Sequence, residues 1–533
     1  MNRLPQAILL AGGLLAGLVV GNAALAQKPG GVLKMYFFDS PASMSIHEEA
    51  TLAAQGPMMG VFNNLVMYRQ DLPLATLESI VPDLASEWWS WDEEKTALNF
   101  KLRQGVKWHD GKPFTAKDVK CTWDMLQGKT TDKLRLNPRK PWYRNLEEVT
   151  TNGDYELTFH LKRPQPAFVA LLASGFSPVY PCHVPPAQMR QHPIGTGPFK
   201  FVEFKPNEYI KVTRNPDYWK KDRPYLDGIE YQIIKNVATG SLAFVSGKVD
   251  MTSWYFLQVP ILADVNNQVG KEVCHLAPTN VLRSVIINRD AAPFGKPEVR
   301  RAIALTLDRQ AFIDTLTQGK GNLGGALLAP PEGVWGLPPE MVRSLPGYGP
   351  DVAANRAEAR KLMEKVGYGP NNRLQTKVTT RNLPPYRDPA VLLIDQLKEI
   401  YIDGELELLD TTQWYPRVTR KDFTIGLNLI TNSVDDPDQT LYEFYTCNAE
   451  ANYDGYCSAE FDKMVDQQSM EFDQQKRKQL VWEIEKKLAE DVARPVLYHS
   501  RSGTCWHPHV KGYTMMVNSI YNGVRMEDVW LDK

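Results

Sequence analysis

The stretch LRQGVKWHDGKPFTAKDV, residues 102–119, decides the fold because a strand end, a turn and a helix start follow one another within it. The residues that lead into it, Ala97–Leu102, alternate between apolar and polar, as in a half-buried strand. Asp110-Gly111 is a tight-turn signal. Thr115–Asp118 has the pattern of a capping box, with an acidic residue in the favourable first turn of a helix.

Further short patterns follow along the chain. They are IGTGPF (194–199), RNPDYW (214–219), YLD (225–227) and VRRAIA (299–304). The glycines and proline of the first suit a turn that needs a permissive backbone and a fixed φ. Helical spacing over 356–366 and 389–400 precedes a strand-like run at 405–409. Strands that alternate with helices in this way predict α/β layering.

Together these patterns resemble the family-five extracellular solute-binding proteins, the dipeptide, oligopeptide and nickel-chelate receptors of ABC importers. Leu84-Ala85 and Trp88 stand where the family has L-A-x-x-W before its strand and L-R-x-G-V motif. The resemblance covers nearly the whole mature chain. It implies an α/β, two-lobed periplasmic-binding-protein fold of class II, with a hinge of two strands and an extra subdomain in the first lobe.

The resemblance also implies lobes that are built discontinuously. We place the hinge crossings near Ala277–Leu282 and His499–Thr504. The expected divisions are a signal peptide at 1–26, a first lobe at 27–75 with 195–279 and 502–533, an extra subdomain at 76–194, and a second lobe at 280–501.

The N-terminus predicts export. Asn2 and Arg3 precede an apolar run, Ala7–Val20, and Ala24-Leu25-Ala26 is a cleavage signal, so we expect a signal peptide cleaved after Ala26 and a periplasmic mature chain. A retained membrane anchor is the alternative, but the run is shorter than the roughly 20 apolar residues of a membrane span.

The composition limits the partners. A chain of 533 residues exceeds the size of a single core and should form several lobes. Its 61 Lys and Arg balance 62 Asp and Glu, for a net charge of −1, which argues against nucleic acid or a membrane surface as partner. The resemblance instead implies a small-molecule ligand and the permease subunits of an importer. We expect the protein to be a monomer.

Six cysteines in an oxidising compartment predict disulfides, and six allow 15 pairings. The near pair Cys447–Cys457 is favoured, since closing a loop of this size stabilises by roughly 2–3 kcal/mol in the chain-entropy model. Cys274 and Cys505 flank the crossings that the resemblance implies, so they form the second expected pair. Cys121–Cys182 would then lie within the extra subdomain.

Enzyme signatures are weak. His109-Asp110 is better explained as a turn, and His507-Pro508-His509 offers two histidines without a third metal ligand in register. The aspartates at 435, 436 and 438 mimic a calcium loop but lack its glycine and terminal glutamate. No G-x-S-x-G, H-E-x-x-H or Walker motif occurs in the sequence. We therefore expect no enzyme, no cofactor and no metal, with a secreted hydrolase or a periplasmic chaperone as the alternative.

The segment 430–457 should form one wall of the ligand pocket, because it follows a strand-like run at 423–430 and is rich in polar and aromatic residues. By the resemblance, the aspartate that binds a peptide's α-amine falls at Ser433. A buried ammonium needs a paired charge, which serine does not supply. Asp435 or Asp436 could take its place, so the case for a peptide ligand is weaker but peptides are not excluded.

Further pocket candidates come from loops that face the cleft in the family: Trp254, Tyr255, Arg381, Asn382, Trp414, Asn432 and His499. Ordinary packing is an equal alternative for each aromatic residue. Arg381 could hold a carboxylate with two parallel hydrogen bonds, or could be a solvated loop charge. We expect a small polar solute, such as a short peptide or a carboxylate compound, to be captured by closure of the hinge.

Overall fold

The structure is a computed structural model that describes residues 27–533. The predicted signal peptide, residues 1–26, lies outside the described residues, and Gln27 is the residue that follows its predicted cleavage site. Within this described part of the chain, no helix has the length and apolar character needed to cross a membrane.

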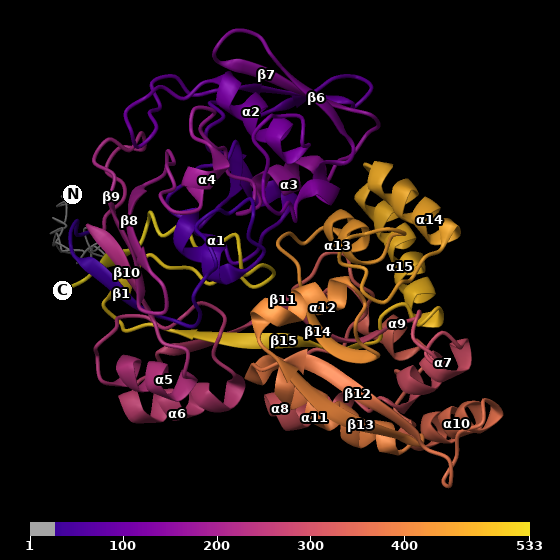
Figure 1. The fold of residues 1–533 in the computed structure, drawn as a ribbon. Helices are drawn as coiled ribbons and strands as arrows, with labels where there is room; N and C mark the ends of the chain where they lie inside the picture. The colour runs from indigo at the N-terminus through magenta and orange to yellow at the C-terminus, as the bar shows by residue number, and fades with distance from the viewer. Residues whose placement is uncertain (1–26) are drawn as a thin grey trace, which may run out of the picture.

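The first lobe is organised around a four-stranded sheet. Its order is β1-β10-β9-β8, with bounds Val32–Phe37 (β1), Gly228–Ile233 (β10), Tyr209–Arg214 (β9) and Phe199–Lys205 (β8). β1 is parallel to β10, and the other neighbours are antiparallel. Helices α5 (Val237–Val245) and α6 (Val259–Val269) lie at the lower edge of this lobe in Figure 1.

The extra subdomain holds a second sheet, in the order β4-β5-β7-β6. Its strands are Ser90–Trp91 (β4), Ala97–Lys101 (β5), Glu156–Leu161 (β7) and Leu146–Thr151 (β6), and its helices are Ala116–Leu126 (α2), Lys140–Tyr143 (η2) and Phe168–Ala173 (α3). The predicted strand, turn and helix of the opening stretch are therefore present. Thr115 caps α2 with the predicted capping box, in which Asp118 Oδ2 accepts from the Thr115 N–H at 2.9 Å.

The second lobe has a five-stranded mixed sheet in the order β13-β12-β14-β11-β15. The strands are Ile402–Leu409 (β13), Leu374–Arg381 (β12), Ile425–Thr431 (β14), Cys274–Ile287 (β11) and Val496–Cys505 (β15). Helices that pack on it are Pro297–Thr306 (α7), Arg309–Thr317 (α8), Val352–Lys365 (α10) and Pro384–Lys398 (α11). Buried residues of the strands and helices form one apolar core, which includes Val299, Val378 and Leu393.

Two long antiparallel strands, β11 and β15, join the lobes (Figure 1). At one end Cys274 pairs with Cys505 in register and by a disulfide, and both lie in a first-lobe core with Tyr36. At the other end the strands belong to the second-lobe core. Between Pro278 and Leu282 their register is interrupted. This is the two-stranded hinge that the resemblance implied.

The remaining elements complete both lobes. They are Leu52–Met59 (α1), Val66–Tyr68 (β2), Leu77–Ser79 (η1), Ile80–Pro82 (β3), Pro186–Met189 (α4), Pro339–Arg343 (α9), Thr411–Thr419 (α12), Pro437–Phe444 (α13), Ala459–Met470 (α14), Gln474–Glu490 (α15), Val510–Lys511 (β16) and Trp530–Leu531 (β17). The other two disulfides join Cys121 to Cys182 and Cys447 to Cys457, which is the predicted pairing.

Candidate functional site

The D-D-P-D turn is a buried ion-pair network within the second lobe. Asp436 begins α13 and receives two hydrogen bonds of 2.8 Å from the Arg477 guanidinium. Asp438 accepts from Arg477 at 3.1 Å and from Gln165 of the extra subdomain at 2.8 Å. A buried carboxylate needs such a partner. These contacts give Asp436 a structural role, so the expectation that it substitutes for the amine-binding aspartate finds no support in its surroundings.

Asn432 and Ser433 lie where the hinge, the second lobe and the C-terminal segment meet. Asn432 Nδ2 donates to Asn280 Oδ1 at 3.2 Å, within the interrupted part of β11. The carbonyl oxygen of Ser433 accepts from Ser519 Oγ at 2.9 Å and from Asn522 Nδ2 at 2.6 Å, both on the first-lobe side. Both predicted residues are buried; Asn432 bonds to the hinge strand, and Ser433 joins the second lobe to the C-terminal segment of the first.

Asp435 also touches both sides. Its Oδ2 accepts from the Val334 N–H at 2.8 Å in the second lobe and from Asn518 Nδ2 at 3.3 Å in the C-terminal segment. Burial raises the pKa of Asp435 to about 7, so a proton is held there much more readily than on an ordinary aspartate.

Three of the predicted aromatic residues are packed in cores. Trp254 has no exposed surface and lies between Phe37 and Tyr231 in the first lobe. Tyr255 is buried, and its hydroxyl accepts from the backbone N–H of Met516 at 2.9 Å. Trp414 has no exposed surface and packs with other buried residues of the second lobe: Ile286, Leu409, Val418, Phe423 and Tyr453. Packing, the alternative that the sequence left open, explains their positions.

Arg381 stands at the carboxyl end of β12, but its donors are engaged within the second lobe. Nη1 donates to Tyr386 Oη at 2.7 Å, and Nε and Nη2 donate to Thr411 Oγ1 at 3.1 and 2.6 Å. Its neighbour Asn382 is exposed. His499 is buried on β15, where its Nε2 bonds to the Gly325 carbonyl at 2.9 Å and burial lowers its pKa to about 4.

A set of tyrosines that the sequence reasoning missed lies between the lobes. We call Tyr386, Tyr415, Tyr453 and Tyr521 the interlobe tyrosine cluster. The first three belong to the second lobe, and Tyr521 belongs to the C-terminal segment of the first-lobe core. Arg381 contacts two of them: its Nη1 donates to Tyr386 Oη at 2.7 Å, and its guanidinium carbon lies 5.7 Å from the ring centroid of Tyr415. Tyr415 is 38% exposed, so it is the member of the cluster most open to solvent.

Opposite charges face each other across the same region. Arg139 of the extra subdomain and Glu443 of α13 meet at Trp142: the Arg139 guanidinium lies 5.4 Å from its ring centroid, and Trp142 Nε1 donates to Glu443 Oε2 at 3.1 Å. Asp39, two residues after β1, adds a small contribution to the raised pKa of Arg381 in the second lobe, after those of Tyr386 and Tyr415. Each lobe therefore supplies one positive and one negative group around the tyrosine cluster.

A second set of contacts between the lobes lies at the edge, and we call it the interlobe latch: Arg144, Arg163, Tyr442 and Asp466. Asp466 Oδ1 accepts from Tyr442 Oη at 2.6 Å, from Arg144 Nη2 at 3.1 Å and from Arg163 Nη2 at 3.3 Å. Arg163 Nη2 also donates to Tyr442 Oη at 2.7 Å, and the Arg144 guanidinium lies 3.9 Å from the Tyr442 ring centroid. The two arginines come from the extra subdomain, and Tyr442 and Asp466 come from α13 and α14.

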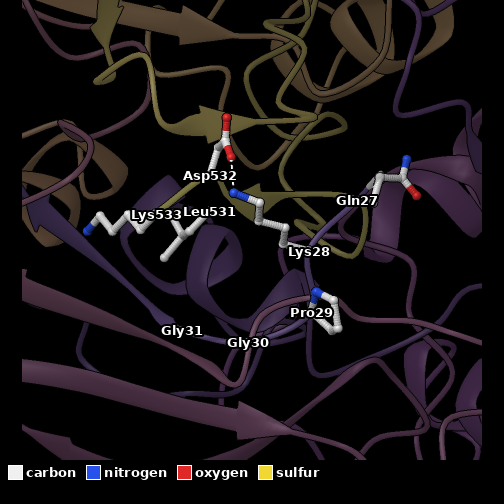
Figure 2. Close-up of a pocket in the computed structure, with 8 residues that line it drawn as sticks. All are labelled: Gln27, Lys28, Pro29, Gly30, Gly31, Leu531, Asp532 and Lys533. Atoms are coloured by element: carbon white, nitrogen blue, oxygen red, sulfur yellow. Dashed lines mark hydrogen bonds and ion pairs between the residues drawn. The ribbon is translucent and has the colours of Figure 1, made fainter. Parts of the chain in front are cut away.

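Two surface hollows lie apart from this region. One, of about 690 Å³, is bounded by residues 27–31 and 531–533, where Lys28 and Asp532 form an ion pair of 2.5 Å (Figure 2). The other, of about 770 Å³, lies in the second lobe between β12, the segment 288–294 and the end of α12. None of the predicted ligand residues lines either hollow.

Comparison with known proteins gives the class. The model of the bacterial extracellular solute-binding proteins, family 5 (middle region), matches residues 79–452. The chain therefore belongs to the family-5 extracellular solute-binding proteins, whose members are binding proteins.

Curated relatives in this family carry peptide names. The chain is 28% identical to a di/tripeptide-binding protein 1 of Pseudomonas aeruginosa over 473 residues, which is 83% of this chain and 83% of that protein. It is 26% identical to the oligopeptide-binding protein AppA of Bacillus subtilis over 464 residues, which is 82% of this chain and 81% of that protein.

Solved structures share the fold. The DppA protein of Helicobacter pylori, in complex with the peptide STSA, has a TM-score of 0.80 at 21% identity and covers 95% of this chain and 99% of its own. The AgaA protein of A. tumefaciens, in complex with agropinic acid, has a TM-score of 0.78 at 22% identity and covers 94% and 99%. The α/β two-lobed periplasmic-binding-protein fold predicted from the sequence is thus confirmed.

Proposed function

We propose that this protein is a periplasmic receptor of an ABC importer that captures a small polar solute, a short peptide or another carboxylate compound, and delivers it to the membrane permease. The family and its di/tripeptide- and oligopeptide-binding relatives support this function. The similar fold of AgaA, whose structure contains agropinic acid, supports keeping carboxylate compounds that are not peptides among the candidates.

The observation that carries the proposal is the interlobe tyrosine cluster with its opposed charges. Tyr415 and Arg381 approach from the second lobe, and Tyr521 and Arg139 approach from the first-lobe side. A solute between them contacts both lobes only when they are closed, so its binding free energy shifts the equilibrium toward the closed form. Closure about β11 and β15 is then the signal that the permease reads.

Several sequence predictions become part of this proposal. The ligand site includes the tyrosine cluster with Arg381, Asn382, Ser433 and Asp435, while the other predicted ligand residues support it from the cores and the hinge. The divisions remain those predicted: a signal peptide at 1–26, a first lobe at 27–75, 195–279 and 502–533, an extra subdomain at 76–194, and a second lobe at 280–501. The mature chain begins after Ala26 and acts as a monomer.

The alternative, a secreted hydrolase or a chaperone of the same fold, is less well supported, because members of the family are binding proteins. Native mass spectrometry of the freshly purified protein should reveal a co-purified small molecule. Small-angle scattering of the protein stripped of that molecule, with and without members of a broad solute library, should show compaction with at least one solute. No compaction with any solute, together with turnover of a substrate, would establish the enzyme instead.

A further inference from the structure

We propose that residues 128–144 of the extra subdomain, which we call the basic segment, form a docking surface for an anionic phospholipid membrane, into which Leu136 inserts. The inference goes beyond the proposed function and rests on it in one respect, since delivery to a permease brings the protein to a membrane. The charge of the whole chain argues against a membrane partner, so the segment has to differ from the rest of the chain.

The basic segment has a charge balance of its own. It contains six Lys and Arg residues against one acidic residue, Asp132, which leaves a net charge of +5. The whole chain of 533 residues carries −1, so positive charge is concentrated in this stretch. The basic residues are Lys129, Lys133, Arg135, Arg139, Lys140 and Arg144.

Most of these charges lie at the surface. Arg139 is buried, whereas the other five basic residues are exposed. Arg144 forms an ion pair with Asp466, but Lys133, Arg135 and Lys140 form none among residues 27–533. Their charges are therefore available to a partner with negative groups, and phosphates attract both ammonium and guanidinium groups.

Leu136 is an apolar side chain presented in the middle of the basic segment. It is 60% exposed. The backbone N–H of Arg135 donates to Glu48 Oε1 at 2.5 Å, and Asn137 Nδ2 donates to the Leu126 carbonyl at 2.7 Å. These bonds hold the chain on both sides of Leu136, so its exposure belongs to the folded structure. Binding at a membrane interface combines burial of such an apolar group with attraction of nearby cations to anionic lipids.

The end of the basic segment lies on the rim between the lobes. Trp142 Nε1 donates to Glu443 Oε2 at 3.1 Å, and Arg144 Nη2 donates to Asp466 Oδ1 at 3.1 Å, with both acceptors in the second lobe. A solute that passes from between the lobes to a permease leaves through an opening that faces the membrane. A segment on the rim of that opening approaches the lipid headgroups during delivery.

The composition of the basic segment favours lipid over an acidic protein surface. Three of its five exposed cations are lysines, Lys129, Lys133 and Lys140. Lysine is depleted in protein–protein interfaces. At an anionic lipid surface, by contrast, each Lys or Arg within about 10 Å adds to the attraction at 0.1 M salt.

The test measures partitioning of the purified full mature chain onto vesicles by co-sedimentation at roughly 0.1 M salt, where charges act over about 10 Å. The vesicles are pure phosphatidylcholine or an equimolar mixture of phosphatidylglycerol and phosphatidylcholine. The charge variant is Lys133→Gln/Arg135→Gln/Lys140→Gln, and the apolar variant is Leu136→Ser.

The matched control removes the same charge from three exposed lysines of the second lobe: Lys320→Gln/Lys361→Gln/Lys476→Gln. Circular dichroism and the affinity for the co-purified solute should be unchanged in every variant, because the substituted side chains are exposed. Should the charge variant fail to fold, Leu136→Ser and the salt dependence of the wild type still decide.

We expect the wild type and the control to partition onto the anionic vesicles at least tenfold more strongly than onto the neutral ones. This preference should vanish in roughly 1 M salt, where the Debye length is about 3 Å. The charge variant should lose at least tenfold, since each Lys or Arg at an anionic surface contributes roughly a fivefold factor. Leu136→Ser should weaken partitioning by a factor that does not depend on salt, because burial of an apolar group is not screened.

Three results overturn the docking surface: equal partitioning of the wild type onto both kinds of vesicle, unchanged partitioning of the folded charge variant, or an equal loss in the control. Unchanged partitioning of Leu136→Ser overturns the insertion of Leu136. Binding of poly-L-glutamate without binding of vesicles would assign an acidic protein surface and overturn the lipid partner. The proposed receptor function fails separately, when no member of the broad library compacts the protein in the absence of vesicles.

Discussion

The interlobe latch gives the sharpest prediction. Replacing Asp466 by Asn keeps the size of the side chain and an acceptor for Tyr442 Oη, but removes the charge that Arg144 and Arg163 share. The bonds join the extra subdomain to α14, so they exist only when the lobes are together. The substitution should therefore weaken closure without loosening either lobe.

The size of the expected change in closure free energy follows from the solvent exposure of Asp466. The side chain of Asp466 is 44% exposed, so each ion pair stabilises closure by about 0.2–1 kcal/mol, in the range of solvent-screened pairs. Two pairs give about 0.4–2 kcal/mol, or roughly a twofold to thirtyfold shift in the open–closed equilibrium, at 1.4 kcal/mol per factor of ten. Where the open form predominates, the apparent dissociation constant of the solute rises by the same factor.

The assay combines small-angle scattering with calorimetry. At a solute concentration that half-saturates the wild type, Asp466→Asn should have the larger radius of gyration; it should also bind the co-purified solute more weakly and with less sensitivity to salt, because screening acts on the wild-type pairs. Glu460→Gln is the control, since Glu460 also lies on α14 but pairs with Lys487 inside the second lobe at 2.9 Å. A radius and an affinity equal to those of Glu460→Gln would refute the latch.

Three further predictions concern pH, packing and the tyrosine cluster. Burial raises the pKa of Glu485 to about 7, and its oxygens accept from the Leu327 and Leu337 N–H groups. Because the folded protein holds this proton more tightly than the unfolded chain, the free energy of unfolding should fall as pH rises from about 4.5 to 7. Glu485→Gln should flatten that decline in thermal melts. Trp414→Ala should lower the free energy of unfolding in urea by about 3–5 kcal/mol, as for a fully buried tryptophan; a loss below 1 kcal/mol would contradict its core position. Tyr415→Phe should weaken solute binding by about 0.5–1.5 kcal/mol in calorimetry, through loss of one hydroxyl, with an unchanged melting temperature; unchanged affinity would remove this hydroxyl from the site.

The fold was predictable because its signals are local. The alternation at Ala97–Leu102 and the capping box at Thr115 correspond to β5 and α2, within a residue of the predicted bounds. The helix expected at 389–400 begins earlier, at Pro384, because two prolines occupy its first turn, where the missing N–H groups are not needed. The crossings near Ala277–Leu282 and His499–Thr504 fall on the paired strands β11 and β15.

The site was less predictable because it depends on which way each side chain turns. Trp414 and Tyr415 are neighbours on α12, yet the first is enclosed by the core and the second is 38% exposed. From the sequence, Asp436 was expected in the pocket, because its ion-pair partner Arg477 is 41 residues away and could not be foreseen. Arg139 carried no motif at all, and its position against Glu49 and Phe176 depends on the tertiary fold.

The Cys274–Cys505 disulfide has a mechanical consequence for the hinge. It clamps β11 to β15 at the edge of the first lobe, so neither strand can slide along the other at that end. The ladder is interrupted four residues further along, between Pro278 and Leu282, so fewer backbone hydrogen bonds oppose bending there. A pair of strands that is clamped at one end and weakened beside the clamp bends mainly at the weak point. We therefore expect the lobes to swing about this point rather than to slide along the strands.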